Sequence, residues 1–523
     1  MPTHAEALAR TLAERGVQYV FGLPGGEIVA FINACREAGL QFLLTGHEAS
    51  AAWMAQVMGQ ITGVPGVCAA TLGPGATNLV TGVANAWLER APMLAVTAQI
   101  PSTAIQTLSH QRLPLKELFS TISKGSFSVG DEDTVQLANR SMDLAAASRP
   151  GPVHISLASD LAIQPYTPAK DSANDAGSPA SSTTVADIAA CLEASARPIV
   201  LIGLGATPSN ANAVRAFVDK LQAPFLVTPK VKGIIAEDHP LFAGVASGVA
   251  IDRDILATIK AADLIVAIGF DPVECDKTWF ADVNVVALDS ISMAEGKYRP
   301  AEAIGDLGQL LVELTSSIAS RRPWPAELIE ARRAAIRRQP ISAISPLRVI
   351  EELRSIFPRD GITTCDVGSH KLVMGQFWRT YVPGTFFMSN GLSGMGFGIP
   401  AAIAARLAHP NKPVLAVVGD GGMLMMVHDL VLIRELNLPI LIVVLSDRSL
   451  SLIRVSAERR GFPPYGVDFT PPDFAALARS FGIASRRAAT IDEVRSAIGE
   501  ALTERVPFLL DVPVDHREYY ELV

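Results

Sequence analysis

Two aspartates near the end of the chain follow apolar stretches in a pattern typical of a cation site. PVLAVVGDGG places Asp420 directly after one predicted strand, and PILIVVLSD places Asp447 after the next. Their spacing of 27 residues accommodates one helix and a return strand, so adjacent strands would bring both carboxylates to one cation. Oxygen ligands suit Mg²⁺ or Ca²⁺, usually shared with a phosphate-bearing ligand. Asp420 could equally be an ordinary N-cap in a glycine-rich turn.

Glycines beside these groups favour a phosphate-binding turn. Those in Gly419-Asp420-Gly421-Gly422 let the backbone approach a phosphate closely, and the helix that follows offers free N–H groups. Gly73-Pro74-Gly75-Ala76-Thr77-Asn78 is a second sharp turn that opens a helix. This second turn could also be a tight loop without a chemical role.

Glu48 stands where an apolar run ends and a Met-rich helical pattern begins. A carboxylate there would be partly desolvated, with a raised pKa unless it is paired. Glutamate also favours the first turn of any helix, which is the structural alternative. His110 and Gln111 are polar residues in a predicted loop, and each by itself could be a plain surface group.

A nucleotide-binding oxidoreductase is a competing class. Gly203-Leu204-Gly205 follows a predicted strand and resembles the start of a dinucleotide-binding loop. Position 208 is Pro where the third glycine of that fingerprint would stand. The fingerprint is therefore incomplete.

Three α/β units position these residues. Short apolar runs alternate with amphipathic helices along the whole chain, which indicates parallel sheets. We therefore predict three consecutive doubly wound parallel-sheet domains. A polar linker at 167–184 separates residues 1–166 from a central domain at 185–330, and Ser345 with Pro346 is predicted to open the third domain, 345–523.

Composition limits the partners. With 44 Lys and Arg against 52 Asp and Glu, the net charge is −8, and runs of five like charges are absent, which argues against nucleic-acid or anionic-membrane binding. The five cysteines lack metal-type spacing and are expected to be reduced and mostly buried. Without a signal-peptide pattern or a long apolar window, we expect a cytoplasmic protein that acts on a small molecule.

Read together, the motifs resemble the thiamine diphosphate-dependent 2-oxo acid decarboxylase and carboligase family, most closely its acetolactate synthase branch. They occur in order along the chain: LPGG at 23–26, HE at 47–48, GPGATNLVTG at 73–82, HQ at 110–111, DVGSH at 366–370, SNGLSGMGFGIP at 389–400, and GDGG with SD at 419–447.

The resemblance implies a pyrimidine-binding first domain, a diphosphate-binding third domain, and active sites shared between subunits of a homodimer or homotetramer. Glu48 would hydrogen-bond the aminopyrimidine and promote loss of the thiazolium C2 proton, and His110 and Gln111 would flank the reacting carbonyl of a 2-oxo acid. Asp420, Asp447 and the carbonyl of Ser449 would hold Mg²⁺. The other implied cofactor contacts are Pro24, Gly25, Gly73, Asn78, Ser369, His370, Gly394, Met395, Gly419, Gly421, Gly422 and Met423.

The sequence departs from the family pattern in segments that are expected to contact the substrate or a flavin. Asp447 stands where the family usually has Asn, and Arg448-Ser449-Leu450-Ser451 replaces the segment after it, which could alter the substrate pocket. The 242–251 segment lacks the Gly-Met/His pattern of flavin-binding members, and GFDPVE at 269–274 resembles the flavin-independent catabolic branch. We therefore expect no tightly bound FAD.

The leading hypothesis is a carboligase that converts pyruvate to acetolactate and CO₂. The alternatives are a decarboxylase or lyase of another 2-oxo acid or of a 2-hydroxyacyl thioester, and a catalytically silent partner subunit. Retention of Glu48 and Asp420 argues against the silent subunit.

Overall fold

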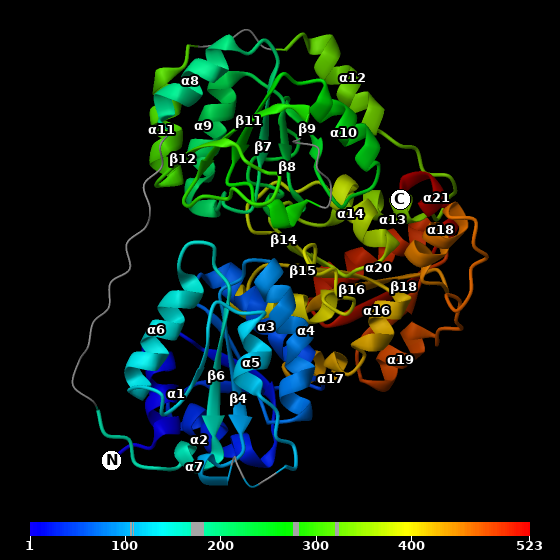
Figure 1. Ribbon diagram of the computed structural model, residues 1–523. Coiled ribbons are helices and arrows are strands. Elements are labelled where there is room, and N and C mark those ends of the chain that lie inside the picture. The colour runs from blue at the N-terminus through cyan, green and yellow to red at the C-terminus, as the bar shows by residue number, and fades with distance from the viewer. Residues whose placement is uncertain (105–106, 108, 169–182, 276–281, 320–323) are drawn as a thin grey trace. The chain divides into compact units, whose positions relative to one another are not determined.

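In this computed structural model the chain folds into three parallel six-stranded sheets interleaved with helices (Figure 1). This architecture confirms the predicted doubly wound α/β class. The structure describes residues 1–104, 107, 109–168, 183–275, 282–319 and 324–523. Most of the predicted linker, residues 169–182, lies outside these ranges. The division into three domains with these boundaries remains a prediction.

The first sheet has the strand order β2-β1-β3-β4-β6-β5. Its strands are β1 Tyr19–Leu23, β2 Gln41–Leu44, β3 Gly66–Ala70, β4 Met93–Gln99, β5 Ser126–Ser128 and β6 Pro152–Ala158. The helices of this part are α1 His4–Glu14, η1 Gly26–Ile28, α2 Val29–Glu37, α3 Glu48–Thr62, α4 Pro74–Leu88, η2 Ser102–Ala104, α5 Leu115–Ser120, α6 Thr134–Ala146 and α7 Ser159–Ala162.

The two faces of the first sheet carry different helices. One hydrophobic cluster joins α1, α2 and α6 to alternate strand residues such as Val67 and Ala69, while residues of α3 and α4 are absent from this cluster. Helices α3 and α4 pack on each other and contact β3 and β4 (Figure 1). Because α3 begins directly after β2, its first residue, Glu48, stands at the carboxyl edge of the sheet, where ligands bind in parallel α/β folds.

The central sheet has the order β12-β11-β10-β7-β8-β9. Numbered within that sheet, the order is 3-2-1-4-5-6 read from β9, which is the arrangement of dinucleotide-binding folds. Its strands are β7 Pro198–Ile202, β8 Phe225–Val227, β9 Phe242–Val245, β10 Leu264–Ile268, β11 Asn284–Asp289 and β12 Ala301–Ile304. The helices are α8 Val185–Ala194, η3 Pro208–Asn210, α9 Ala211–Leu221, η4 Pro229–Val231, α10 Asp252–Lys260, η5 Pro272–Glu274, α11 Leu307–Ser317 and α12 Ala326–Ile336.

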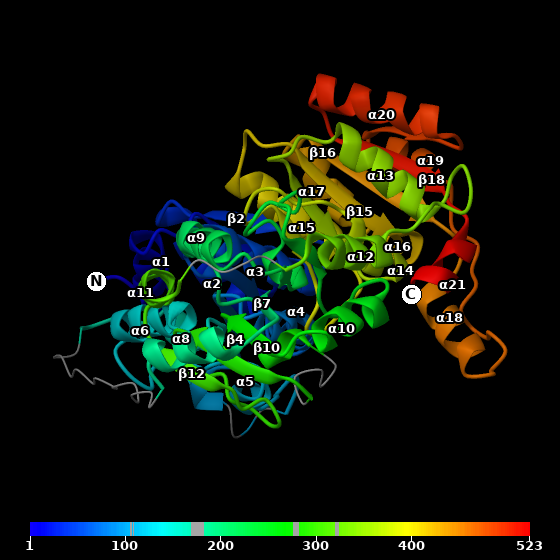
Figure 2. The ribbon, with the colours of Figure 1, turned by 90° about the horizontal axis from the view of Figure 1, so that it is seen from above.

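The third sheet, β14-β13-β15-β16-β18-β17, repeats the strand arrangement of the first, as their similar layout in the sequence predicted. Its strands are β13 Ile362–Cys365, β14 Phe386–Met388, β15 Val414–Gly419, β16 Ile440–Ser446, β17 Ala484–Arg487 and β18 Phe508–Pro513. The helices are α13 Pro346–Ile356, α14 Ser369–Phe377, α15 Gly398–Ala408, α16 Asp420–Met425, α17 Asp429–Glu435, α18 Ser451–Arg459, α19 Phe474–Ser480, α20 Ile491–Glu504, η7 His516–Glu518 and α21 Tyr519–Leu522. Helices α13 and α20 lie side by side on this sheet (Figure 2).

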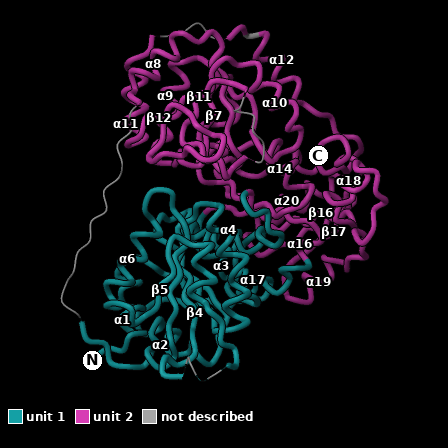
Figure 3. The backbone as a smooth tube through the Cα atoms, viewed as in Figure 1, with its two compact units in different colours: residues 1–176, 391–411, 424–440 teal, residues 177–390, 412–423, 441–523 magenta. Residues whose placement is uncertain are grey.

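The chain folds into two compact units, and each unit is made of segments that are not contiguous in the sequence (Figure 3). Unit 1 joins residues 1–176 to two later segments, 391–411 and 424–440, which include α15 and α17. Helix α15 packs against α3 within this unit. Unit 2 contains the central sheet and the third sheet.

Several local predictions are confirmed. Ser345 caps α13 by accepting the backbone N–H of Arg348, and Pro346 is the first helical residue. All five cysteines are free, and three of them, Cys35, Cys68 and Cys365, are buried. Among the described residues, none of the helices combines the length and hydropathy that crossing a bilayer requires.

A buried ion pair stabilises unit 2. The ammonium of Lys232 lies 2.9 Å from the carboxylate of Glu237, and both side chains are fully buried. The same carboxylate accepts the backbone N–H of Thr380, which joins the segment after β8 to the end of α14.

Candidate active site

Glu48 is the first residue of α3, as its place at a strand-to-helix junction predicted. His47 caps the helix, because its Nδ1 accepts the backbone N–H of Ala49 at 3.0 Å. The Glu48 side chain is buried, and its Oε2 accepts a hydrogen bond of 2.9 Å from the Nδ2 of Asn78. Asn78 comes from the glycine-rich turn that opens α4. The structure therefore joins two of the predicted site residues directly.

Glycines at the carboxyl edge of the first sheet let its turns approach one another and Glu48 closely. A Cβ atom at Gly75 would lie 3.2 Å from Oε1 of Glu48 and 2.9 Å from the side chain of Thr71. At Gly25 a Cβ would lie 2.5 Å from the same threonine. The turn after β1, which carries Pro24 and Gly25, thus meets the turn after β3. Pro24 itself is exposed.

Gln111 lies over the start of the glycine-rich turn. A Cβ at Gly73 would come within 3.2 Å of the Gln111 side chain, and both residues have positive φ, 59° and 55°. His110 precedes Gln111 and is exposed, as is Gln111. The structure therefore brings Gln111 against a predicted cofactor-binding turn.

The loop that carries Met395 also packs on α3. Gly394 and Gly396 flank Met395 and approach the indole of Trp53, at 3.5 Å and 3.2 Å measured to their hypothetical Cβ atoms. Gly396 has a φ of 97°, and its Cβ would lie 2.7 Å from Met426. A larger residue is excluded at Gly396, and Gly394 is in van der Waals contact with Trp53, so the loop lies close to the helix that bears Glu48.

Asp420 and Asp447 follow β15 and β16, which are adjacent strands, so the condition under which their spacing would bring the two carboxylates together is met. Burial, reinforced by the charge of Asp447, raises the pKa of Asp420 to about 6. Burial likewise raises the pKa of Asp447 to about 6. A shared cation would stabilise the charged forms of both carboxylates, buried Asp420 and partly buried Asp447.

Most oxygens of these carboxylates already accept hydrogen bonds. Asp420 accepts the backbone N–H groups of Gly421 at 2.8 Å and Arg448 at 2.7 Å. Asp447 accepts the N–H of Ser449 at 3.2 Å and the hydroxyl of Ser451 at 2.7 Å. In the part of the chain that the structure describes, no three His, Cys, Asp or Glu side chains form a metal-binding group. A cation here would need backbone and ligand oxygens as well.

Buried polar groups without a partner lie close to these aspartates. The Oγ of Ser369 and the Nε2 of His370, in the first turn of α14, are buried and lack a hydrogen-bond partner. Burial, with the nearby Lys371 charge, lowers the pKa of His370 to about 4, so its ring is neutral at pH 7. A Cβ at Gly419 would lie 3.1 Å from this ring. These groups fit an anion such as a diphosphate.

The glycines after β15 are also sterically required. A Cβ at Gly422 would lie 2.0 Å from Oδ2 of Asp366, which follows β13. Gly421 and Met423 share this first turn of α16, and Met423 is buried. Larger residues would therefore disturb the turn where the cofactor contacts are predicted.

Ser50 of α3 and two residues that contact it, His428 and Asp429, are absent from the sequence-based set. Ser50 is fully buried on α3, and its Oγ lies 2.8 Å from Oδ2 of Asp429 and 3.2 Å from Nε2 of His428. The only signal in the sequence is the polar pair His428-Asp429 within the apolar run MLMMVHDLVLI.

Comparison with known proteins agrees with this architecture. Profiles of the thiamine pyrophosphate enzymes match residues 2–119 as the N-terminal TPP binding domain, 185–314 as the central domain and 366–512 as the C-terminal TPP binding domain. The chain is 31% identical to a probable acetolactate synthase large subunit of Methanocaldococcus jannaschii, over 99% of the chain and 93% of the relative.

Two bacterial relatives cover a similar extent. Identity is 30% to an acetolactate synthase of Bacillus subtilis, over 99% of the chain and 94% of the relative. It is 31% to the acetolactate synthase isozyme 2 large subunit of Escherichia coli, over 98% and 96%. With the three domain matches and the three parallel sheets, these likenesses show that the chain belongs to the thiamine pyrophosphate enzymes as an acetolactate synthase-like enzyme.

Proposed function

We propose that this enzyme is a Mg²⁺-dependent acetolactate synthase that converts pyruvate to acetolactate with release of CO₂. The observation that carries the proposal is the buried Glu48 carboxylate at the start of α3, held by Asn78 beside a turn that Gly75 allows to approach closely. A positioned, buried carboxylate of this kind is suited to moving a proton within a bound ligand.

Thiamine diphosphate, when bound, supplies a thiazolium carbon that becomes a nucleophile on losing its proton. Glu48 would hold a proton at its free Oε1 and exchange it with the aminopyrimidine, while Asn78 fixes the orientation of Oε2. Gln111, seated over Gly73, would face the reacting carbonyl together with His110.

The predicted metal and diphosphate contacts are compatible with the local geometry. Asp420 and Asp447, with the carbonyl of Ser449, would hold Mg²⁺, and a cation between them would offset the burial that raises the pKa of both carboxyls. Ser369 and His370 would donate hydrogen bonds to the diphosphate, since both are buried and without a partner.

We propose further that the central domain works without flavin. Its strand order leaves a crevice at the carboxyl ends of β7 and β10, where dinucleotides bind in this topology. The carboxylate of Glu274 occupies that position, because it accepts the N–H of Leu204 at 2.8 Å and the hydroxyl of Thr228. A Cβ at Gly203 would lie 2.6 Å from this carboxylate. An absorbance spectrum of the purified enzyme, with flavin fluorescence after heat release, tests this.

We also propose a homodimer or homotetramer in which Glu48 of one copy serves the diphosphate site of another. Glu48→Gln and Asp420→Ala copies, each inactive alone, should then regain activity when they are co-refolded or co-expressed. If the activity of the mixture never exceeds the summed activities of the two separate preparations, shared active sites are refuted. The free, largely buried thiols fit a reducing compartment such as the cytoplasm.

The decisive experiment combines the apoprotein with thiamine diphosphate, Mg²⁺ or EDTA, and a panel of 2-oxo acids. CO₂ release and the ligated product are measured together. We expect acetolactate from pyruvate, loss of activity in EDTA and loss of activity in Glu48→Gln. Release of acetaldehyde without acetolactate, or turnover of only another 2-oxo acid or a 2-hydroxyacyl thioester, would instead identify a decarboxylase or lyase.

A further inference from the structure

The first turn of α3 rests on a cluster of polar side chains that the proposed chemistry does not use. Ser50, two residues after Glu48, is fully buried. Its Oγ lies 2.8 Å from Oδ2 of Asp429, 3.2 Å from Nε2 of His428 and 3.2 Å from the sulfur of Met426. These partners follow Ser50 by more than 370 residues in the sequence and belong to the same compact unit.

The hydrogen-bond directions in this cluster follow from its chemistry. A hydroxyl has one proton, and the carboxylate of Asp429 is a stronger acceptor than a thioether or an imidazole. Ser50 therefore donates to Asp429 and accepts from the Nε2–H of His428. The imidazole also lies 3.4 Å from Oδ1 of Asp429. The cluster is a connected set of contacts around Ser50 that orients each member.

The loop before α3 is held by the same residues. A Cβ at Gly46 would lie 2.4 Å from the His428 ring, so the ring packs directly on the backbone that leads into the helix. The rings of His47 and His428 are 6.3 Å apart. Glu48 is thus flanked on both sides in the sequence by residues that contact His428 or Asp429.

We propose that Asp429 is a positioning residue for Glu48, acting through Ser50 and with His428 as its second contact. Asn78 fixes one oxygen of Glu48 from the side of α4, while the Asp429 cluster fixes the backbone from which Glu48 projects. This inference rests on the proposed role of Glu48. Asp429, which lies far from α3 in the sequence, would thus keep the Glu48 carboxylate correctly placed relative to its ligand.

The burial of Asp429 disfavours a negative charge on its carboxyl group. Asp429 is fully buried, and burial raises its pKa to about 7, opposed by the Ser50 hydrogen bond. The titratable group in contact with it is His428, whose pKa is lowered by burial and by His47, the N-cap of α3. A change at Asp429 should therefore alter the pH profile of the reaction as well as its rate.

The test compares Asp429→Asn, Asp429→Glu and Ser50→Ala with wild type. The control is Asp133→Asn, since Asp133 caps α6 in the same unit and Asn caps equally well. Each variant is loaded with thiamine diphosphate and Mg²⁺, and three quantities are measured. These are the cofactor Kd, the thermal midpoint of the apoprotein and the rate of deuterium exchange at C2 of the bound cofactor.

We expect Asp429→Asn and Ser50→Ala to slow C2 exchange at least about tenfold, because small misplacements of a catalytic group have effects of this size. Cofactor Kd should change little, and Asp429→Glu should recover part of the rate. Exchange at the wild-type rate in Asp429→Asn and Ser50→Ala, or a loss confined to thermal midpoint and Kd, would overturn the inference. If Asp429→Asn does not fold, Ser50→Ala alone decides between these results.

Glu48→Gln separates this inference from the proposed function. Slow exchange in Glu48→Gln with normal exchange in Asp429→Asn would refute the positioning role and leave the role of Glu48 intact. Normal exchange in Glu48→Gln would refute the proposed function itself, and the positioning role with it.

Discussion

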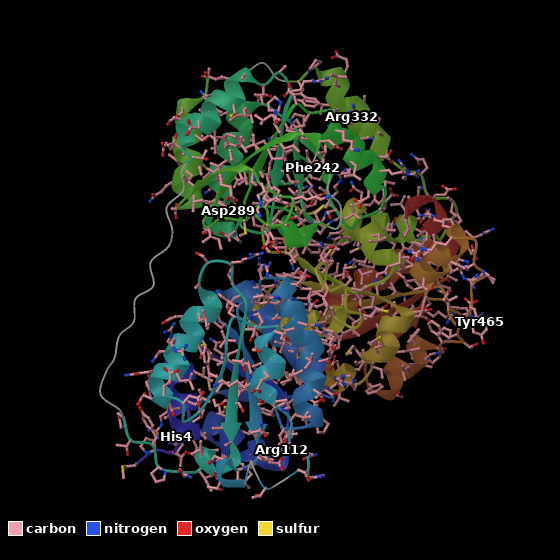
Figure 4. The ribbon with its side chains drawn as sticks, in the orientation of Figure 1. His4, Arg112, Phe242, Asp289, Arg332 and Tyr465 are labelled. Carbon is pink, nitrogen blue, oxygen red and sulfur yellow. The ribbon has the colours of Figure 1, made fainter. Side chains whose placement is uncertain are left out.

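Replacing Glu274 by Gln should stabilise the protein in a strongly pH-dependent way. Glu274 is 3% exposed and follows β10 of the central sheet. Asp289, labelled in Figure 4, ends the neighbouring strand β11. Burial raises the pKa of Glu274 to about 8 from 4.5, with the charge of Asp271 adding to the shift. The amide would keep the shape of the side chain and remove the need to bury a charge.

The hydrogen bonds of the native side chain survive the substitution. The Gln oxygen can accept the N–H of Leu204 as Oε2 does, and the Gln nitrogen can donate to the oxygen of Thr228. Below pH 4.5, where the native acid is neutral in both states, the two proteins should therefore differ by less than about 1 kcal/mol.

The sign and size of the effect follow from proton linkage. Because the folded-state pKa is raised, the contribution of Glu274 to stability is complete below pH 4.5 and is lost as the pH rises through about 8. At 1.36 kcal/mol per pKa unit, the loss is roughly 3 kcal/mol at pH 7 and roughly 5 kcal/mol above pH 8. Glu274→Gln avoids this loss.

Urea midpoints of the two proteins should be measured between pH 4 and pH 9, with Glu313→Gln on the exposed face of α11 as control. The midpoint of Glu274→Gln should exceed that of wild type by an amount that grows with pH, while the control stays level with wild type. A constant difference, or one that shrinks with rising pH, would refute the assignment of a buried, proton-binding carboxyl to this crevice.

Further predictions concern the metal site, the turn beside it and the ion pair of unit 2. Asp420→Ala should weaken Mg²⁺-dependent binding of thiamine diphosphate at least about tenfold by fluorescence titration, since a direct oxygen ligand is lost. Asp447→Asn should keep that binding, because the amide still presents an oxygen; equal loss in both variants would contradict their different roles. Gly422→Ala, whose Cβ would lie 2.0 Å from Asp366, should lower the thermal midpoint and cofactor affinity together, at a cost of about 1 to 3 kcal/mol. Lys232→Met should lower stability by about 3 to 5 kcal/mol in urea unfolding, because its glutamate partner stays buried without a counter-charge; an unchanged midpoint would exclude a structural ion pair.

Local patterns in the sequence predicted the fold class and much of the site. Apolar runs ended by glycine or aspartate identified β15 and β16, and their spacing allowed one helix and a return strand between Asp420 and Asp447. That the two strands are neighbours came from the sheet order. Ser345 and Glu48 were found at helix starts because capping and strand-to-helix transitions depend on a few neighbouring residues. These features depend on residues that are close together in the sequence, so they can be predicted without the tertiary structure.

The contacts of α3 depended instead on the three-dimensional arrangement. Ser50 and Asp429 are separated by 379 positions, and neither the helical period of α3 nor the apolar run around Asp429 indicates that they meet. Their contact exists because residues 391–411 and 424–440 pack with the first part of the chain. Glu274 likewise looked like part of a short motif, and only the order of the central strands placed its carboxylate at a dinucleotide-type crevice. Long-range pairing is set by the burial of whole helical and sheet faces, and a one-dimensional pattern does not specify which faces will meet.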